Sequence, residues 1–320
     1  MTTPREAFLS ALDRRPLPGL VPHFEIIFSP TMEAFGRVHP LHRNYAQWDQ
    51  MKPGERRLHI RDMADLYIQI AEKFQHSAIL VIQVSSDESE LFGVINEIRN
   101  RVGDRYCLLC TGDATFAIPD GDGIVEFSYR MADEPEKLHA EAEEKLRFFT
   151  RRAERLHKST SIDGMVLCSD YCFNTGPFLS PLQFSEFIAP YLARQVQAFR
   201  DMGYYVIKHT DGNILPILDQ LVQARPHAIH SLDPQAGIDI ADIIRRAGSQ
   251  VCLCGNVDCG LMDTGTVAQV EESARYALRS GMMADGYIFS SSNCIYTGLP
   301  LERYELAWRI WQEEGVRPAR

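Results

Sequence analysis

Five apolar runs in the second half of the chain each end in polar or metal-binding side chains. They are Gly164–Asp170, Tyr204–Asn213, Ala228–Asp233, Val251–Asp258 and Tyr287–Cys294. A strand of a parallel sheet reads as a short apolar run because both of its faces are covered. In an α/β barrel the functional residues lie where such strands end. The repeated pattern therefore predicts one rim that receives polar side chains from all five runs.

Similar runs alternate with helical patterns along the whole chain, including a helix expected over 267–281. Alternation of this kind implies a parallel sheet, and eight units favour closure into a barrel. The eight expected strands span 21–28, 78–84, 106–111, 165–168, 205–209, 228–231, 251–254 and 287–291. We therefore predict a single α/β domain over 1–320, a (β/α)8 TIM barrel. An N-terminal helix precedes the first strand, and an irregular excursion over the rim, residues 30–55, follows it.

An open, doubly wound sheet is the structural alternative. That fold needs a glycine-rich phosphate-binding turn after its first strand. No such turn follows residues 21–28, so the barrel is favoured.

Composition excludes several classes of protein. The net charge of −10 argues against nucleic acid as the main partner, because phosphate binding needs a basic surface. No apolar stretch reaches the roughly 20 residues that a membrane helix requires. The N-terminus lacks the apolar core of a signal peptide, so we expect a cytoplasmic protein.

Three segments resemble the uroporphyrinogen decarboxylase superfamily. They are REAFLSALDRRPLPGLVP near the start, SDYCFNTGPFLSPLQFSEFIAPYLARQV in the middle and GYIFSSSNCIYTGLPLERY near the end. The resemblance covers most of the chain in order and implies the barrel fold. It also implies one of two chemistries: decarboxylation of a tetrapyrrole without a cofactor, or zinc-dependent methyl transfer involving a corrinoid protein.

The decarboxylase branch fits this sequence poorly. That branch carries an arginine-rich signature for substrate carboxylates, whereas no arginine stands between residue 22 and Arg37 here. Its final Gly-His-Gly turn is replaced by Ser292, Asn293 and Cys294. A substrate with many carboxylates needs a cationic cleft. Decarboxylation of a smaller acid, or a ligand-binding barrel without catalysis, remains an alternative.

The methyltransferase branch has a His-x-Cys pair after one strand and a cysteine near the last strand, which together hold zinc. Here the pair reads His209-Thr210-Asp211, and the late cysteine is Cys294. An alignment on Ile295 would instead put Asn293 in the place of that cysteine. The resemblance thus implies a zinc site, and imidazole, carboxylate and thiolate all bind zinc. The expected ligands are His209, Asp211, Cys254 and Cys294.

Further polar residues lie at the same expected rim or point into the barrel. Glu25 is one, because a carboxylate inside a barrel is costly unless it is paired or binds a ligand. We expect roles in catalysis for Asp87, Asp170 and Glu25. We expect substrate contacts from Tyr171, Asn174, Asn213, Asn256 and His230. The alternative for Asp170 and Asn174 is a capped turn, which Asp and Asn also favour.

The function expected from the resemblance is zinc-dependent transfer of a methyl group between a small substrate and a corrinoid protein or thiol. The corrinoid would be carried by a partner protein that docks over the barrel mouth. Members of the superfamily are often dimers, so a homodimer is expected. In the metal-free alternative, Asp211 orients His209 inside a hydrogen-bonding pocket.

Overall fold

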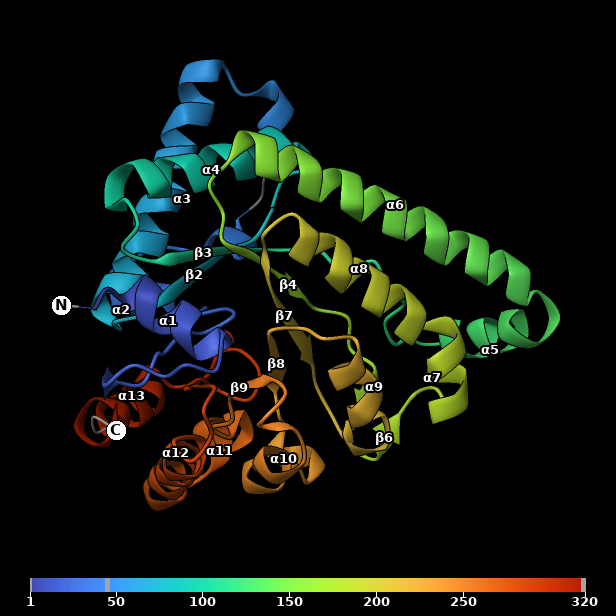
Figure 1. The fold of residues 1–320 in the computed structure, drawn as a ribbon. Coiled ribbons are helices and arrows are strands. Elements are labelled where there is room, and N and C mark those ends of the chain that lie inside the picture. The colour runs from blue at the N-terminus through green and yellow to red at the C-terminus, as the bar shows by residue number, and fades with distance from the viewer. Residues whose placement is uncertain (1, 44–46, 318–320) are drawn as a thin grey trace.

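The computed structural model, which describes residues 2–43 and 47–317, has a TIM-barrel-like α/β fold (Figure 1). Seven parallel strands form one curled sheet in the order β10-β9-β8-β7-β4-β3-β2. The strands are β2 (Ala78–Val81), β3 (Cys107–Thr111), β4 (Gly164–Leu167), β7 (Tyr205–Thr210), β8 (Ala228–Ser231), β9 (Cys252–Cys254) and β10 (Tyr287–Ile288). The predicted fold class is confirmed.

The eighth place in the ring belongs to residues 21–28, which do not form the regular strand that we predicted. Only isolated bridges, His23 to Phe289 and Phe28 to Ile295, join this segment to the end of the chain. Pro22 has no N–H to donate to a ladder, which favours irregular pairing. The segment still closes the ring, since the Phe289 N–H donates to the Pro22 carbonyl at 2.9 Å and the Ser77 N–H to the His23 carbonyl at 2.6 Å.

Alternation along the strands divides the core in two. Side chains that point inward fill the barrel and include Phe24, Leu80, Leu109, Val166, Ile207, Ala228, Cys252 and Cys254. Side chains of the opposite parity pack outward against the helices in a larger cluster. Since successive residues of a strand face opposite sides, this parity decides which polar residues reach the mouth.

Helices surround the sheet: α1 (Pro4–Leu12), α3 (Pro53–Lys73), α4 (Glu88–Val102), α5 (Gly123–Asp133), α6 (Pro135–Ser159), α7 (Pro181–Phe187), α8 (Ala189–Asp201), α9 (Leu218–Gln223), α10 (Ile240–Ala247), α11 (Cys259–Thr264), α12 (Val267–Gly281) and α13 (Leu301–Glu314). The helices α5 and α6 meet at Pro135, and α7 and α8 meet just before Pro190. Glu134, which precedes Pro135, is not helical, as expected for a residue before proline. Pro190 has no N–H to continue the hydrogen bonds of α7, so a new helix begins there.

Helix α6 is the longest helix described and runs beyond the sheet to α5 and α7 (Figure 1). Beside them, the short hairpin of β5 (Cys172–Phe173) and β6 (Gly176–Pro177) follows β4. A separate antiparallel pair, β1 (Gly19–Leu20) and β11 (Val316–Arg317), lies near the ends of the chain. No described helix has the length and apolar character needed to cross a membrane.

The predicted excursion contains α2 (Thr31–Phe35) and two short 3-10 helices, Pro40–His42 and Trp48–Gln50. Ion pairs from Arg37 and Arg43 to Asp62 hold it against α3. Trp48 is buried, and its indole N–H donates to Asp87 at 3.2 Å. The excursion is therefore fixed to the barrel wall at both of its ends.

Candidate active site

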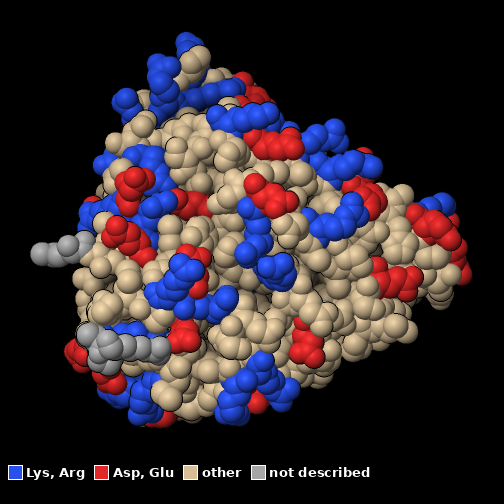
Figure 2. Space-filling model, viewed as in Figure 1, with Lys and Arg blue, Asp and Glu red and all other residues tan. Residues whose placement is uncertain are grey.

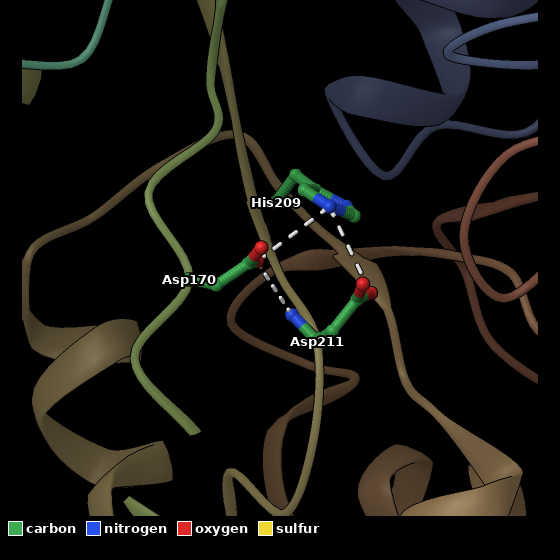
Figure 3. Close-up of side chains that lie close together, drawn as sticks. All are labelled: Asp170, His209 and Asp211. Atoms are coloured by element: carbon green, nitrogen blue, oxygen red, sulfur yellow. Dashed lines mark hydrogen bonds and ion pairs between the residues drawn. The ribbon is translucent and has the colours of Figure 1, made fainter. Parts of the chain in front are cut away.

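Three side chains at the carboxyl end of the sheet bring ligand-type atoms within 4.8 Å of one another (Figure 3). Asp170 follows β4, His209 lies in β7 and Asp211 comes directly after β7. His209 Nε2 lies 3.8 Å from Asp170 Oδ1 and 3.7 Å from Asp211 Oδ1. The Asp211 N–H donates to Asp170 Oδ1 at 3.0 Å, which ties the two loops together. The predicted convergence of imidazole and carboxylate at one rim is present.

Two residues of this cluster, Asp211 and His209, have pKa values shifted from their ordinary values. The pKa of Asp211 is raised to about 7, chiefly by burial and in smaller part by the nearby charges of Asp170 and Asp233, against the opposing hydrogen bond from Asn293. Burial lowers the pKa of His209 to about 4. Asp211 Oδ1 is buried and accepts no hydrogen bond from any described residue. A buried oxygen without a partner is costly, and a water molecule, ion or ligand bound at this position would remove that cost.

His230, which we predict to contact substrate, forms a hydrogen bond with His209. The two Nδ1 atoms lie 2.9 Å apart, and His230 Nε2 lies 3.2 Å from the Ser290 hydroxyl. His230 and Ser290 are fully buried. Burial holds the pKa of His230 well below its ordinary value, so the ring is neutral at pH 7.

A buried ion pair behind the sheet supports the loop that carries Asp170. Lys208 Nζ donates to Asp113 Oδ2 and to the Ser169 carbonyl, each at 2.8 Å. The Ser169 N–H also donates to Asp113, at 2.9 Å. Lys208 lies 4.1 Å above the Tyr171 ring. Sequence reasoning missed this pair, although a lysine within an apolar strand was its available signal, because a buried charge needs a partner.

The predicted cysteine ligands do not join the cluster. Among the described residues, the groups that could share an ion with His209 are Asp170 and Asp211 alone. The Cys254 thiol lies in the barrel core, where burial raises its pKa well above the usual range. Burial also raises the pKa of Cys294, to about 11. The last loop of the barrel reaches the cluster through Asn293 and not through Cys294: Asn293 Nδ2 donates to Asp211 Oδ2 at 2.5 Å.

Of the other residues expected to act in catalysis, Glu25 is buried and Asp87 is not. Glu25 accepts hydrogen bonds from the Ser291 N–H and hydroxyl, and burial raises its pKa to about 8. Asp87 caps α4 by accepting from the Ser89 N–H at 2.9 Å. Neither carboxylate belongs to the His209 cluster, so the roles expected for both in catalysis remain predictions.

The four remaining residues expected to touch substrate have structural partners or lie outside the cluster. The Tyr171 hydroxyl is buried and bonds to Thr115 at 2.6 Å. Asn174 is exposed in the turn between β5 and β6. Asn213 accepts from the Leu215 N–H at 3.2 Å, and Asn256 donates to the Leu232 carbonyl at 2.8 Å.

A cavity of about 490 Å³ lies near the cluster, although Asp170, His209 and Asp211 are not among its lining residues. Cys168 and Ser169, which directly precede Asp170, line one side, and Phe148 and Arg152 of α6 line another. Cavities of this size suit small organic ligands. A slightly larger cavity, about 530 Å³, lies near α1 and β1, and none of its lining residues belongs to the cluster. The smaller cavity is connected to the cluster through Ser169, the chain neighbour of Asp170, and is therefore the candidate substrate site.

Comparison with known proteins identifies the family. A sequence model of the uroporphyrinogen decarboxylase (URO-D) family matches residues 121–313, more than half of the chain. The chain belongs to the URO-D family. The matched region begins before α5 and includes every residue of the His209 cluster.

Solved structures also match the chain at low sequence identity. A methyltransferase from Methanosarcina mazei matches with a TM-score of 0.71 at 16% identity, covering 98% of this chain and 99% of the other. At this identity, the likeness establishes the shared fold. A D-psicose 3-epimerase, solved with D-fructose present, matches with a TM-score of 0.43 at 10% identity over 80% of this chain and 91% of its own. No curated protein matches the URO-D chain significantly.

Proposed function

We propose that this protein is a zinc-dependent methyltransferase that moves a methyl group between a small substrate and a corrinoid protein or thiol. The observation that carries the proposal is the buried Asp211 Oδ1, which lacks a hydrogen-bond donor and lies 3.7 Å from His209 Nε2. URO-D family membership and a fold shared with a methyltransferase support the same reaction class.

The donor set fits a divalent metal ion. Asp170, His209 and Asp211 would hold it, and imidazole nitrogen and carboxylate oxygen are established zinc ligands. A metal bound by three protein ligands keeps an open position for a substrate atom, as catalytic zinc sites do. When bound, zinc supplies Lewis acidity, which lowers the pKa of a coordinated group and stabilises its anion.

The surrounding residues orient the donors and hold the substrate. Asn293 fixes the Asp211 carboxylate from the last loop of the barrel. The Lys208–Asp113 pair fixes the backbone before Asp170. The adjoining cavity supplies an aromatic wall at Phe148 and a buried guanidinium at Arg152, whose Nη1 donates to the Thr111 carbonyl at 2.7 Å. These contacts hold the ligand atoms in place before substrate binds, which limits the reorganisation needed for reaction.

A partner protein that carries a corrinoid would dock beside the mouth. Large apolar side chains are exposed on the elements that follow β3 and β4, namely Tyr129 of α5, Phe173 of β5 and Leu182 of α7. Of these elements, α5 and α7 lie close to the far end of α6 (Figure 1). Lys and Arg side chains are interspersed with Asp and Glu on the face shown in Figure 2. Apolar contact with a protein surface suits the α5–α7 region.

The cluster also suits a second chemistry, metal-free decarboxylation of a small acid. The raised pKa of Asp211, about 7, leaves its carboxyl partly protonated near neutral pH. A protonated Asp211 donates a proton to the carbanion that forms as carbon dioxide leaves. Removal of metal separates the two candidates, because it abolishes methyl transfer and leaves decarboxylation intact.

Zinc content and methyl transfer test the proposal together. Purified protein should hold one zinc ion per chain, measured by elemental analysis. His209→Ala and Asp211→Asn should each lose that ion, together with methylation of free cob(I)alamin by methylated donors. His157→Gln, at an exposed position on α6, is the matched control and should retain both. Protein that stays metal-free after growth and dialysis with zinc would refute the proposal.

A further inference from the structure

We infer that His230 and Ser290 are positioning residues that lock His209 in the tautomer whose bare Nε2 faces Asp170 and Asp211. The inference depends on the proposed function in one respect: the proposed zinc ion is the species that His209 Nε2 would bind. It concerns the path Ser290–His230–His209, which crosses the inside of the barrel from the end of β10 to β7.

The first step is the proton of Ser290. Its hydroxyl lies 3.1 Å from the Ser291 carbonyl, which can only accept, and 3.2 Å from His230 Nε2. A hydroxyl has one proton to donate and two lone pairs. With the proton directed to the carbonyl, a lone pair faces His230 Nε2. That nitrogen therefore carries hydrogen and donates it to Ser290.

The second step is the contact between the two histidines. Their Nδ1 atoms lie 2.9 Å apart, so one of them donates and the other accepts. A neutral imidazole carries one N–H, and His230 already holds its own on Nε2. His230 Nδ1 is thus the acceptor, and His209 Nδ1 is the donor.

The third step concerns Nε2, the ring nitrogen of His209 that faces Asp170 and Asp211. With hydrogen on Nδ1, Nε2 carries only a lone pair. The carboxylate oxygens of Asp170 and Asp211 lie 3.8 and 3.7 Å from it, too far for hydrogen bonds. An Nε2–H would draw a carboxylate closer. The separation instead leaves three acceptor atoms facing a common point, as metal ligands do.

A metal-bound histidine usually donates its other N–H to a carboxylate, a carbonyl or water, and loss of that partner weakens metal binding about 10- to 100-fold. Here the acceptor is a second histidine, itself fixed by a serine. His230 is fully buried among apolar residues and bonds to no described carboxylate. Its orientation therefore depends on Ser290.

The tautomers can be read directly by 15N NMR of metal-free protein labelled on histidine. We expect His209 to show hydrogen on Nδ1 and His230 to show hydrogen on Nε2. The opposite pair of tautomers would overturn the inference. Because this measurement uses no metal, it decides the inference even if the protein proves not to bind zinc.

Metal titration gives the second readout. His230→Leu should weaken Zn²⁺ binding about 10- to 100-fold and mix the His209 tautomers, and Ser290→Ala should do so by a smaller factor. His230→Gln, whose side-chain oxygen can accept from His209, should recover most of the affinity. His76→Leu is the matched control, because His76 is also a buried histidine and bonds to Tyr304 at 3.0 Å instead. Equal losses in His230→Leu and His76→Leu would mean a general packing effect and would refute the positioning role. If wild-type protein binds no Zn²⁺ while the NMR tautomers are as expected, the proposed function fails and the inference stands.

Discussion

The side-chain amide of Asn293 donates to the Asp211 carboxylate at 2.5 Å, although Asn293 and Asp211 are 82 residues apart. The last loop of the barrel thus reaches the His209 cluster through an amide, and the thiol of the next residue, Cys294, does not belong to the cluster. This one-residue offset distinguishes the site from a site with two thiolate ligands.

The offset predicts that a ligand can be added at position 293. Asn293→Cys should place a thiolate beside Asp211 and tighten zinc binding by about tenfold or more, since thiolate is a strong zinc ligand. Competition titration with a chelator measures the change. Cys294→Ser is the matched control and should leave the affinity unchanged. A loss of affinity in Cys294→Ser would show that the native thiol reaches the metal.

Replacement of the buried Lys208 should lower the free energy of unfolding. In wild-type protein, burial favours the neutral form of Asp113, but the charge and hydrogen bond of Lys208 outweigh it and lower the pKa of Asp113. Lys208→Met leaves that carboxylate buried without its cation, at a cost of about 3–5 kcal/mol in the free energy of unfolding. Denaturant titration tests this. Lys208→Met combined with Asp113→Asn should recover part of the loss, and equal stability of the single and double variants would contradict the pairing.

Glu25 should make stability fall as pH rises. Its pKa is about 8 in the folded protein, against about 4.5 when unfolded, because of burial. The folded state therefore binds more protons between these values, and the stabilisation present below pH 4.5 is lost as pH passes 8. Glu25→Gln should flatten the decline of the free energy of unfolding between pH 5 and 9. Glu33→Gln, at an exposed position, should leave the decline as in wild type.

Asp87 offers a test between a structural and a catalytic role. It caps α4 and accepts from the Trp48 indole, so Asp87→Ala should lower the free energy of unfolding by about 0.5–2 kcal/mol. Zinc affinity should not change, because Asp87 lies outside the cluster. Asp87→Asn, which keeps an acceptor oxygen, should retain most of the stability. Full loss of activity in a stable Asp87→Asn protein would restore the catalytic role expected from the sequence.

The regular parts of the fold were predictable because local signals define them. Helix α12 begins and ends at the predicted residues, since Thr266 and Gln269 form a capping box at its start. The ends of the apolar runs predicted that His209 and Asp211 lie at one rim, but the expected ligands beside them were Cys254 and Cys294, whereas Asp170 is the third member of the observed cluster. Residues 21–28 were predicted as a strand from their composition, but pairing across the closing seam depends on residues more than 260 positions away.

The contacts that orient the side chains of the site could not be predicted either, because they also join residues far apart in the sequence. Lys208 finds Asp113 across 95 residues, and His230 finds Ser290 across 60. Periodicity shows that Lys208 and His209 face opposite sides of a strand. It does not show which side chains from other elements lie next to them. The choice between Asn293 and Cys294 depends on the path of one loop, which a single sequence leaves open.

Residues 21–28 form one wall of the barrel without a regular strand. Every other pair of neighbouring strands is joined by a ladder, whereas the described residues of this wall are held by isolated bridges to the end of the chain and by the Ser77 N–H on the β2 side. The same wall carries Glu25 and leads directly into the excursion. If the mouth must widen to admit a bulky partner, parting between this wall and β2 breaks one backbone hydrogen bond of the described residues, from the Ser77 N–H to the His23 carbonyl. Amide exchange in the ring should then be fastest there.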